Sequence, residues 1–350
     1  MNKDKHKLIL IIAFLIAIVS VAIIFGAFLS PTTQNPIGLS VLPQTNQSNP
    51  EKVEVRLKWV HQAQFAGFYV AQEKGYYSKN NLDVQLNPGG VDFPAINMVA
   101  GGKEQFGVTS ADQILFAREK GIPIVAIATI YRKNPMVLFS LKDLGIKQPS
   151  DLIGKKVGVA VNKEILYHML LKKTGVDSGK VTEVPIKVDI TPLLTGQVDA
   201  WIANIISEPI TAQEKGFEVD IIWLSDYDVN FYGDVLFTTE DMIKNHPDIV
   251  RGFVNATLDG WNYAYDNPDE AVDYTMQYAS ASNSVHETKM MQASLQLIKP
   301  DDRHIGDMQQ KEWENMQQQM LEAGAMKSPV DLGKTFTNQF VENYYNETSN

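Results

Sequence analysis

Hydrophobic and polar positions follow two alternating patterns from about residue 53 to residue 225. Short alternating or fully apolar runs, typical of β-strands, are followed by segments of helical period that end at a glycine. The repeated strand–helix order predicts parallel-type α/β sheets with helices on both faces. The clearest predicted strands are 53–59, 82–87, 106–110, 123–132, 181–187 and 219–225.

The pattern also divides the chain. A second α/β unit begins near Lys142, and from Thr239 to Tyr345 almost every segment has helical period. A chain of 350 residues is long enough for two domains of ordinary size. We therefore expect two α/β units followed by a largely helical region.

The N-terminus carries the strongest local signal. Lys3, Lys5 and Lys7 precede an apolar run, 8–29, that contains no charged residue. Cleaved signal peptides have apolar cores of about 7–15 residues, whereas a membrane-spanning helix needs about 20. Because no good cleavage site follows, we favour a membrane anchor over 1–29, with a cleaved signal as the alternative. The lysines place the rest of the chain outside the cytoplasm, after an extended, proline-rich linker over 30–51 that carries no charge up to residue 50.

Composition excludes several classes of protein. The net charge of −10 argues against nucleic-acid binding, which needs a basic face. The chain has no cysteine, which excludes disulfides, thiolate nucleophiles, cysteine-ligated metals and a lipid anchor on cysteine. Its six histidines show no metal-ligand spacing, and no hydrolase or phosphate-loop motif is present. We therefore predict no enzyme activity, no metal and no cofactor.

Polar and aromatic residues gather where predicted strands lead into helices. Ligands of open α/β sheets bind at the carboxyl ends of strands, and aromatic and amide groups there suit a flat heterocycle. For each candidate a plainer role, in core packing or helix capping, is the alternative. The candidate ligand-binding residues are Trp59, His61, Gln64, Phe68, Ser110, Asn162, Trp201, Asn204, Glu208, Tyr232 and Asp234.

Four motifs together resemble a known family. They are KWVHQAQFAGFYVAQEKGYY (58–77), GGKEQFGVTSADQILFAREKGIPIVAIA (101–128), PSDLIGKKVGVAV (149–161) and GQVDAWIANIISEPITAQEKG (196–216). With the weaker segment YGDVLFTTEDMI (232–243), they are similar to the periplasmic-type solute-binding proteins of ABC transporters. The branch is the ThiY-like one, which binds thiamine-pyrimidine precursors and includes the yeast-type pyrimidine synthases.

The resemblance implies a type II periplasmic-binding-protein-like α/β fold. Two lobes are joined by two crossing strands, near Phe139–Leu141 and Gly233–Phe237, and a ligand cleft lies between them. Lobe one would comprise 52–140 and 237–345, and lobe two 141–236. The matching tryptophan of the family lies at the cleft, which supports Trp59 as an aromatic wall.

The resemblance also implies a function. We expect an extracytoplasmic protein that delivers a small heterocycle, pyrimidine or flavin-like, to the permease and ATPase subunits of an ABC importer. One alternative is a ligand-sensing input protein for a membrane partner. Another is a pyrimidine synthase, but those enzymes carry a cysteine-rich iron motif, and this chain has no cysteine. The ligand itself stays open.

Overall fold

The computed structural model describes residues 49–160, 163–187 and 189–348. The predicted anchor, most of the predicted linker and Asn162 lie outside these ranges. Across the ranges that are described, no helix combines the length and apolarity needed to cross a membrane. The fold below therefore concerns the chain from residue 49 onward.

The first of two five-stranded sheets has the strand order β2-β1-β3-β10-β4. β1 runs parallel to β2 and β3, whereas β10 is antiparallel to both β3 and β4. All six side chains of β4 are buried, as its continuous apolar sequence predicts. The strands are β1 (Glu51–Arg56), β2 (Leu82–Asn87), β3 (Phe106–Thr109), β4 (Ile124–Thr129) and β10 (Val235–Thr239).

The second sheet repeats this plan with the order β7-β6-β8-β5-β9. β6 is parallel to β7 and β8, and β5 is antiparallel to β8 and β9. In each sheet one antiparallel strand thus lies among parallel ones. The strands are β5 (Met136–Leu141), β6 (Lys156–Val159), β7 (Thr182–Pro185), β8 (Ala200–Asn204) and β9 (Val219–Trp223).

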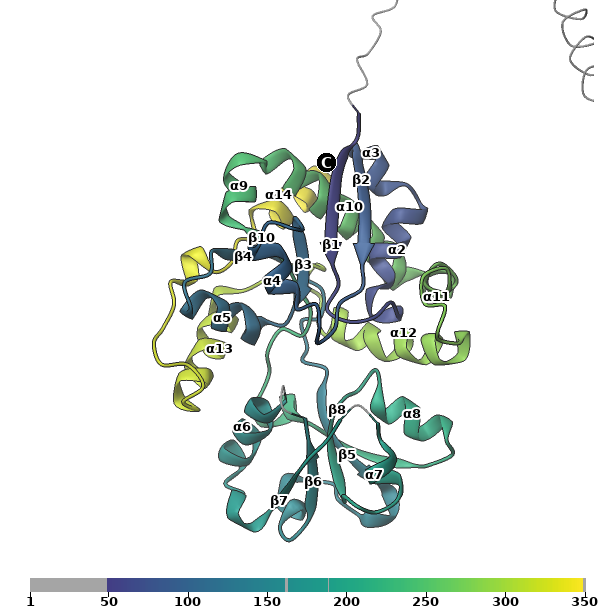
Figure 1. Ribbon diagram of the computed structural model, residues 1–350, viewed down its shortest axis with the longest axis vertical. Helices are drawn as coiled ribbons and strands as arrows, with labels where there is room; N and C mark the ends of the chain where they lie inside the picture. The colour runs from purple at the N-terminus through teal and green to yellow at the C-terminus, as the bar shows by residue number, and fades with distance from the viewer. Residues whose placement is uncertain (1–48, 161–162, 188, 349–350) are drawn as a thin grey trace, which may run out of the picture. The chain divides into compact units, whose positions relative to one another are not determined.

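Helices surround each sheet (Figure 1). The region after residue 239 is helical, as its periodicity predicts. The helices that pack with the first sheet are α2 (Ala66–Glu73), α3 (Tyr76–Lys79), α4 (Ala95–Ala100), α5 (Ala111–Glu119), α9 (Glu240–Asn245), α10 (Pro247–Asp266), α11 (Pro268–Met276), α12 (Ser284–Ile298), α13 (Gln310–Glu322) and α14 (Gln339–Thr348). The helices that pack with the second sheet are α6 (Glu164–Thr174), α7 (Thr191–Leu194) and α8 (Glu208–Glu214). Short 3-10 helices are η1 (Ala63–Phe65), η2 (Lys142–Leu144), η3 (Pro149–Leu152), η4 (Ser178–Lys180), η5 (Leu224–Tyr227) and η6 (Leu332–Lys334).

The chain passes between the sheets twice, over 130–135 and over 224–234. The first passage lies before the predicted crossing at Phe139–Leu141, because β5 already belongs to the second sheet. The change of pattern near Lys142 marks the end of β5. The second passage ends at Val235, which lies in the first sheet although lobe two was expected to reach residue 236. The two passages are hydrogen-bonded together, since Ile130 N–H donates to the carbonyl of Asp234 at 2.7 Å.

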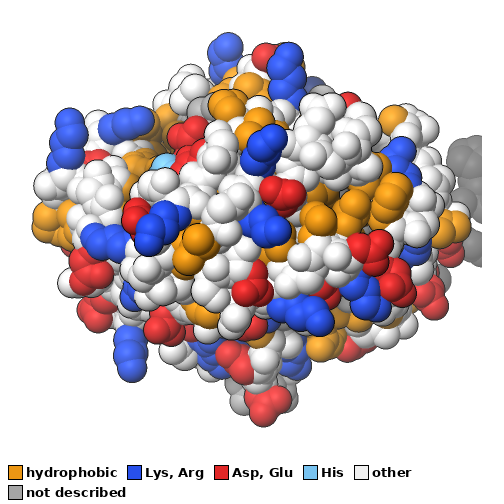
Figure 2. Space-filling view, turned by 90° about the horizontal axis from the view of Figure 1, so that it is seen from below, with side chains coloured by type: hydrophobic (Ala, Val, Ile, Leu, Met, Phe, Trp, Pro, Cys, Tyr) orange, Lys and Arg blue, Asp and Glu red, His pale blue; other side chains and the backbone are white. Residues whose placement is uncertain are grey.

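We call each sheet with the helices packed on it one half of the described chain. Helices of the two halves also touch. Glu214 at the end of α8 lies 2.9 Å from Nδ1 of His286 and 3.4 Å from Nζ of Lys289, both on α12. Ile206 and Ile210 of the second half join the hydrophobic core of the first. On the face seen in Figure 2, basic and acidic side chains are interspersed, and hydrophobic ones form separate groups.

Candidate functional site

The register of the strands places the carboxyl ends of both sheets against the same two passages. In the first sheet, Val235 at the start of β10 pairs with Thr109 and Thr129, the last residues of β3 and β4. In the second sheet, Met136 at the start of β5 pairs with Asn204, the last residue of β8. Both passages therefore leave from carboxyl edges, which are the edges where α/β sheets bind ligands.

A buried carboxylate organises the edge of the first sheet. Asp234 accepts hydrogen bonds from Lys58 Nζ at 3.0 Å and from the Gln64 side-chain amide at 2.7 Å. Gln64 in turn accepts a bond from Gln62 at 2.6 Å, and both Gln64 and Asp234 are almost fully buried. Lys58 also donates to the carbonyl of Gly233. Gln64 and Asp234 thus join the β1–α2 turn to the second passage, and their polar atoms already have partners.

Three predicted residues at this edge keep part of their surface exposed: Trp59, His61 and Ser110. Trp59 is partly buried and packs against the hydrophobic core of the first half. His61 Nδ1 lies 3.0 Å from the Tyr69 hydroxyl, and burial lowers the pKa of the imidazole below its ordinary value. Ser110 precedes α5, and its hydroxyl makes no capping bond to that helix. A ring, an imidazole and a hydroxyl therefore stand at this edge.

The edge of the second sheet carries an ion pair. Glu208, at the start of α8, accepts a bond from Lys163 Nζ at 2.8 Å and one from the N–H of Asn204 at 2.9 Å. Both side chains of the ion pair are mostly buried but reach the surface. Asn204 uses its own Oδ1 to accept from Ile206 N–H. Glu208 thus offers little free acceptor capacity, whereas the Asn204 amide nitrogen has no bond within the described chain.

Two other predicted residues are packed in cores. Phe68 is buried on α2 with its ring edge-on to Trp261, and Trp201 is buried within β8. Core packing was the plainer alternative for aromatics in such runs, and their burial fits it. Asn162 lies outside the described residues. Ligand contact by these side chains stays a prediction.

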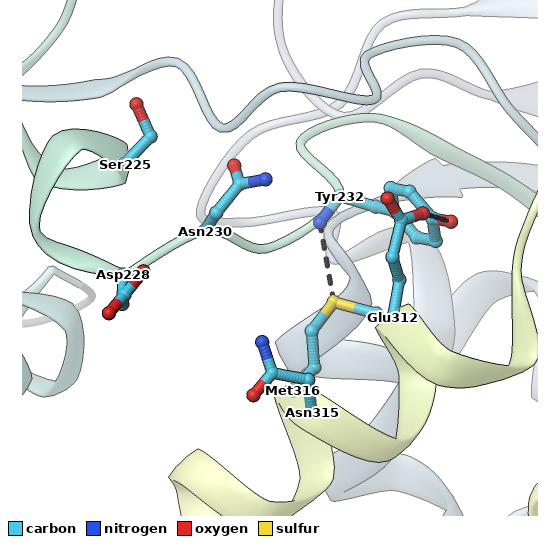
Figure 3. Close-up of a pocket in the computed structure, with 7 residues that line it drawn as sticks. All are labelled: Ser225, Asp228, Asn230, Tyr232, Glu312, Asn315 and Met316. Atoms are coloured by element: carbon cyan, nitrogen blue, oxygen red, sulfur yellow. Dashed lines mark hydrogen bonds between the residues drawn. The ribbon is translucent and has the colours of Figure 1, made fainter. Parts of the chain in front are cut away.

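Tyr232 lies within the second passage and has a different setting. Its hydroxyl bonds to Glu312 and accepts from Gln309 N–H at 2.9 Å, and burial first, then Glu312, raises its pKa far above the ordinary value. The side chain lines a cavity of about 270 Å³ between η5 and α13 (Figure 3). The other lining residues are Ser225, Asp228, Asn230, Glu312, Asn315 and Met316.

Sequence reasoning missed both lysines of the two edges. Lys58 pairs with Asp234 and Lys163 pairs with Glu208, and both of these carboxylates are candidates of the sequence analysis. No spacing rule links residues so far apart, although Lys58 lies two residues after the end of β1 and Lys163 directly follows the candidate Asn162. In the described part of the chain, no three His, Asp or Glu side chains are arranged to hold a metal ion.

Several known proteins are similar in sequence to this chain over most of its length. Riboflavin-binding protein RibY from Chloroflexus aurantiacus is 26% identical over 92% of this chain and 95% of its own. Formylaminopyrimidine-binding protein from Halalkalibacterium halodurans is 26% identical over 78% and 87%. A 4-amino-5-hydroxymethyl-2-methylpyrimidine phosphate synthase from Legionella pneumophila is 22% identical over 83% and 92%.

Solved structures agree on the fold. The aliphatic sulphonate binding protein SsuA from Escherichia coli superposes with a TM-score of 0.66 at 15% identity, covering 83% of this chain and 92% of its own. This confirms the predicted two-sheet periplasmic-binding-protein fold. The model of the NMT1/THI5 like family matches residues 62–271, and the chain therefore belongs to that family.

Proposed function

We propose that this protein is an extracytoplasmic solute-binding protein that captures a small heterocycle between its two halves and delivers it to an ABC importer. One observation carries the proposal: the carboxyl edges of both sheets flank the same two chain passages. A ligand held there contacts both halves at once, and only such a ligand favours one arrangement of the halves over another.

The side chains at the two edges suit a flat, polar-rimmed ligand. Trp59 offers a partly exposed ring for stacking, while His61 and Ser110 offer a nitrogen and a hydroxyl beside it. Because burial lowers its pKa, the imidazole of His61 is neutral at pH 7 and can donate or accept. From the opposite edge, the Asn204 amide can donate to a ring carbonyl or nitrogen. In small-molecule sites, apolar contact such as stacking holds the ligand, and a few hydrogen bonds to its edge fix its orientation.

The relatives support a heterocyclic ligand. RibY is named for riboflavin and the Halalkalibacterium protein for a formylaminopyrimidine, and both match most of this chain. Solute-binding proteins work with permease and ATPase subunits, so we infer these as partners. The predicted anchor over 1–29 would tether the protein to the membrane; if it is a cleaved signal, the protein is secreted or periplasmic.

An enzymatic role is the second candidate, because relatives named as pyrimidine phosphate synthases also match. Those enzymes are expected to need cysteines, and this chain has none. The described residues also hold no cluster fit for a metal. Binding without chemistry is therefore the better-supported function, either for transport or for sensing through a membrane partner.

Mass spectrometry of small molecules released from the purified protein tests the proposal. We expect a heterocycle, and adding it back should raise the melting temperature. A ligand at about 100 times its dissociation constant stabilises by about 2.7 kcal/mol, which is easily measured. If nothing is released, and no compound in a panel of pyrimidines, flavins, nucleobases, amino acids and sulfonates stabilises the protein, the proposal is wrong.

A further inference from the structure

Exposed hydrophobic side chains are unevenly placed on the described chain. Three of them, Val60, Val91 and Phe93, lie on the two loops that follow β1 and β2. Val91 is 80% exposed and Phe93 52%. Among the residues that the structure describes, the large hydrophobic side chains that are exposed are Val60, Val91, Phe93, Leu144, Ile153, Phe217 and Val285. Apolar side chains that gather at one place on a surface mark a site of binding.

The two loops meet at the carboxyl edge of the first sheet. β1 and β2 are parallel neighbours, so their following loops leave the same edge. Gly89 N–H donates to the carbonyl of Trp59 at 2.8 Å. A Cβ on Gly89 would lie 1.9 Å from the carbonyl oxygen of Leu57, so only glycine allows this approach. Val60, Val91 and Phe93 therefore flank the backbone that carries Trp59; we name these three residues the apolar lip.

A buried ion pair holds the β2 loop in place. Arg56 pairs with Glu104 through two hydrogen bonds and donates a third to the carbonyl of Pro88 at 2.5 Å. Its guanidinium carbon lies 5.4 Å from the centre of the Phe93 ring. This ring is therefore fixed by a cation–π contact and exposed to water, instead of folding into the core. A held, exposed aromatic side chain loses little entropy when a ligand covers it.

We propose that the apolar lip is the specificity-determining part of the ligand site and selects a fused aromatic ring system, such as the tricyclic ring of a flavin, over a single pyrimidine ring. The inference rests on the proposed function and deepens it. A single pyrimidine ring is smaller than an indole, so stacking on Trp59 alone would cover one of its faces. Only a wider ring system reaches beyond Trp59 to remove Phe93 and Val91 from water as well, and that added apolar burial favours the larger ligand.

The test compares two probes on the full-length protein in detergent. Riboflavin binding is followed by its fluorescence, and 4-amino-5-hydroxymethyl-2-methylpyrimidine binding by calorimetry. Phe93→Ala should weaken riboflavin binding about tenfold, as expected for losing one aromatic contact, and change pyrimidine binding less than about twofold. The matched control is Phe217→Ala, which removes an exposed phenylalanine of the second half and should change neither affinity. Urea midpoints should be the same for both variants.

Two results with Phe93→Ala would overturn the inference while leaving solute binding intact. One is an unchanged riboflavin affinity in Phe93→Ala. The other is an equal loss for both probes, which would mean that the lip packs on the second half or on a partner and not on the ligand. Tighter binding of the pyrimidine by the wild type would also refute the selection of a fused ring. If neither probe binds, the heterocyclic ligand of the proposed function fails together with the lip.

Discussion

Residues at the two carboxyl edges differ in how much of their bonding capacity the protein itself uses. Gln64, Glu208 and Asp234 accept bonds from neighbouring side chains or backbone. Removing one of them would leave a partly buried lysine or amide without its partner, at a cost of about 1–3 kcal/mol. Trp59 is different, because it packs against the hydrophobic core while part of its surface stays exposed. It is therefore the residue at which binding and stability separate best.

Trp59→Ala should weaken ligand binding at least about tenfold, because stacking adds about 0.5–1.5 kcal/mol to the burial of ring area. Unfolding by urea should change much less than the roughly 3–5 kcal/mol expected for emptying a buried aromatic site. Phe68→Ala is the control, since Phe68 is fully buried and should lose that stability. Full affinity together with a loss of several kcal/mol in Trp59→Ala would make Trp59 a core residue.

At the scale of elements, the contact of α2 with α10 positions the site. The turn that carries His61 and Gln64 leads into α2, and α2 lies directly on α10. A Cβ on Gly67 would lie 2.2 Å from the ring of Trp261, and one on Gly260 would lie 2.1 Å from the carbonyl oxygen of Gly67. Gly67 and Gly260 thus allow the two helices to approach each other closely.

Gly260→Ala should destabilise the fold by about 1–3 kcal/mol or more, because the added methyl group meets backbone that cannot move aside. Gly252→Ala is a control in the same helix. Its added Cβ would meet only Asn80, at 3.3 Å, and alanine favours the helix by about 0.5–1 kcal/mol. Urea unfolding measures both variants. Equal stability in the two would show that α2 and α10 can separate without cost.

The elements themselves were largely predictable, because burial imposes its period on each of them. The apolar run of β4 and the mixed helices after residue 239 are examples. The positions of the passages were harder to predict. β5 is a buried, apolar strand that could belong to either sheet, and its sequence does not say which sheet it joins. Partners distant in sequence were out of reach: Lys58 with Asp234 depends on the fold. Position at a strand end selected candidate residues that the fold does place along the two carboxyl edges, but it did not show which of their side chains stay free.

On the scale of the whole molecule, the two passages, the apolar contacts of Ile206 and Ile210, and the contacts of Glu214 all join the halves. Burial alone would raise the pKa of Glu214, but its contacts with His286 and Lys289 outweigh burial and lower it, so the carboxylate is charged at neutral pH. None of these three residues lies at the carboxyl edges of the sheets. The contact therefore stabilises one arrangement of the halves without depending on the ligand.

Glu214→Gln should weaken the binding of every ligand by the same factor, because it changes the population of the binding-competent arrangement and not the site. A partly exposed ion pair contributes about 0.2–1 kcal/mol, so losing the energy of one such pair predicts a loss of about 1.4- to fivefold. Calorimetry on both probes measures the loss, and small-angle scattering should show less compaction at subsaturating ligand. Glu218→Gln, which breaks a pair with Lys142 inside the second half, should change nothing. Because Phe93→Ala is expected to act on riboflavin alone, a ligand-selective loss in Glu214→Gln would place Glu214 at the site and contradict its role in joining the halves.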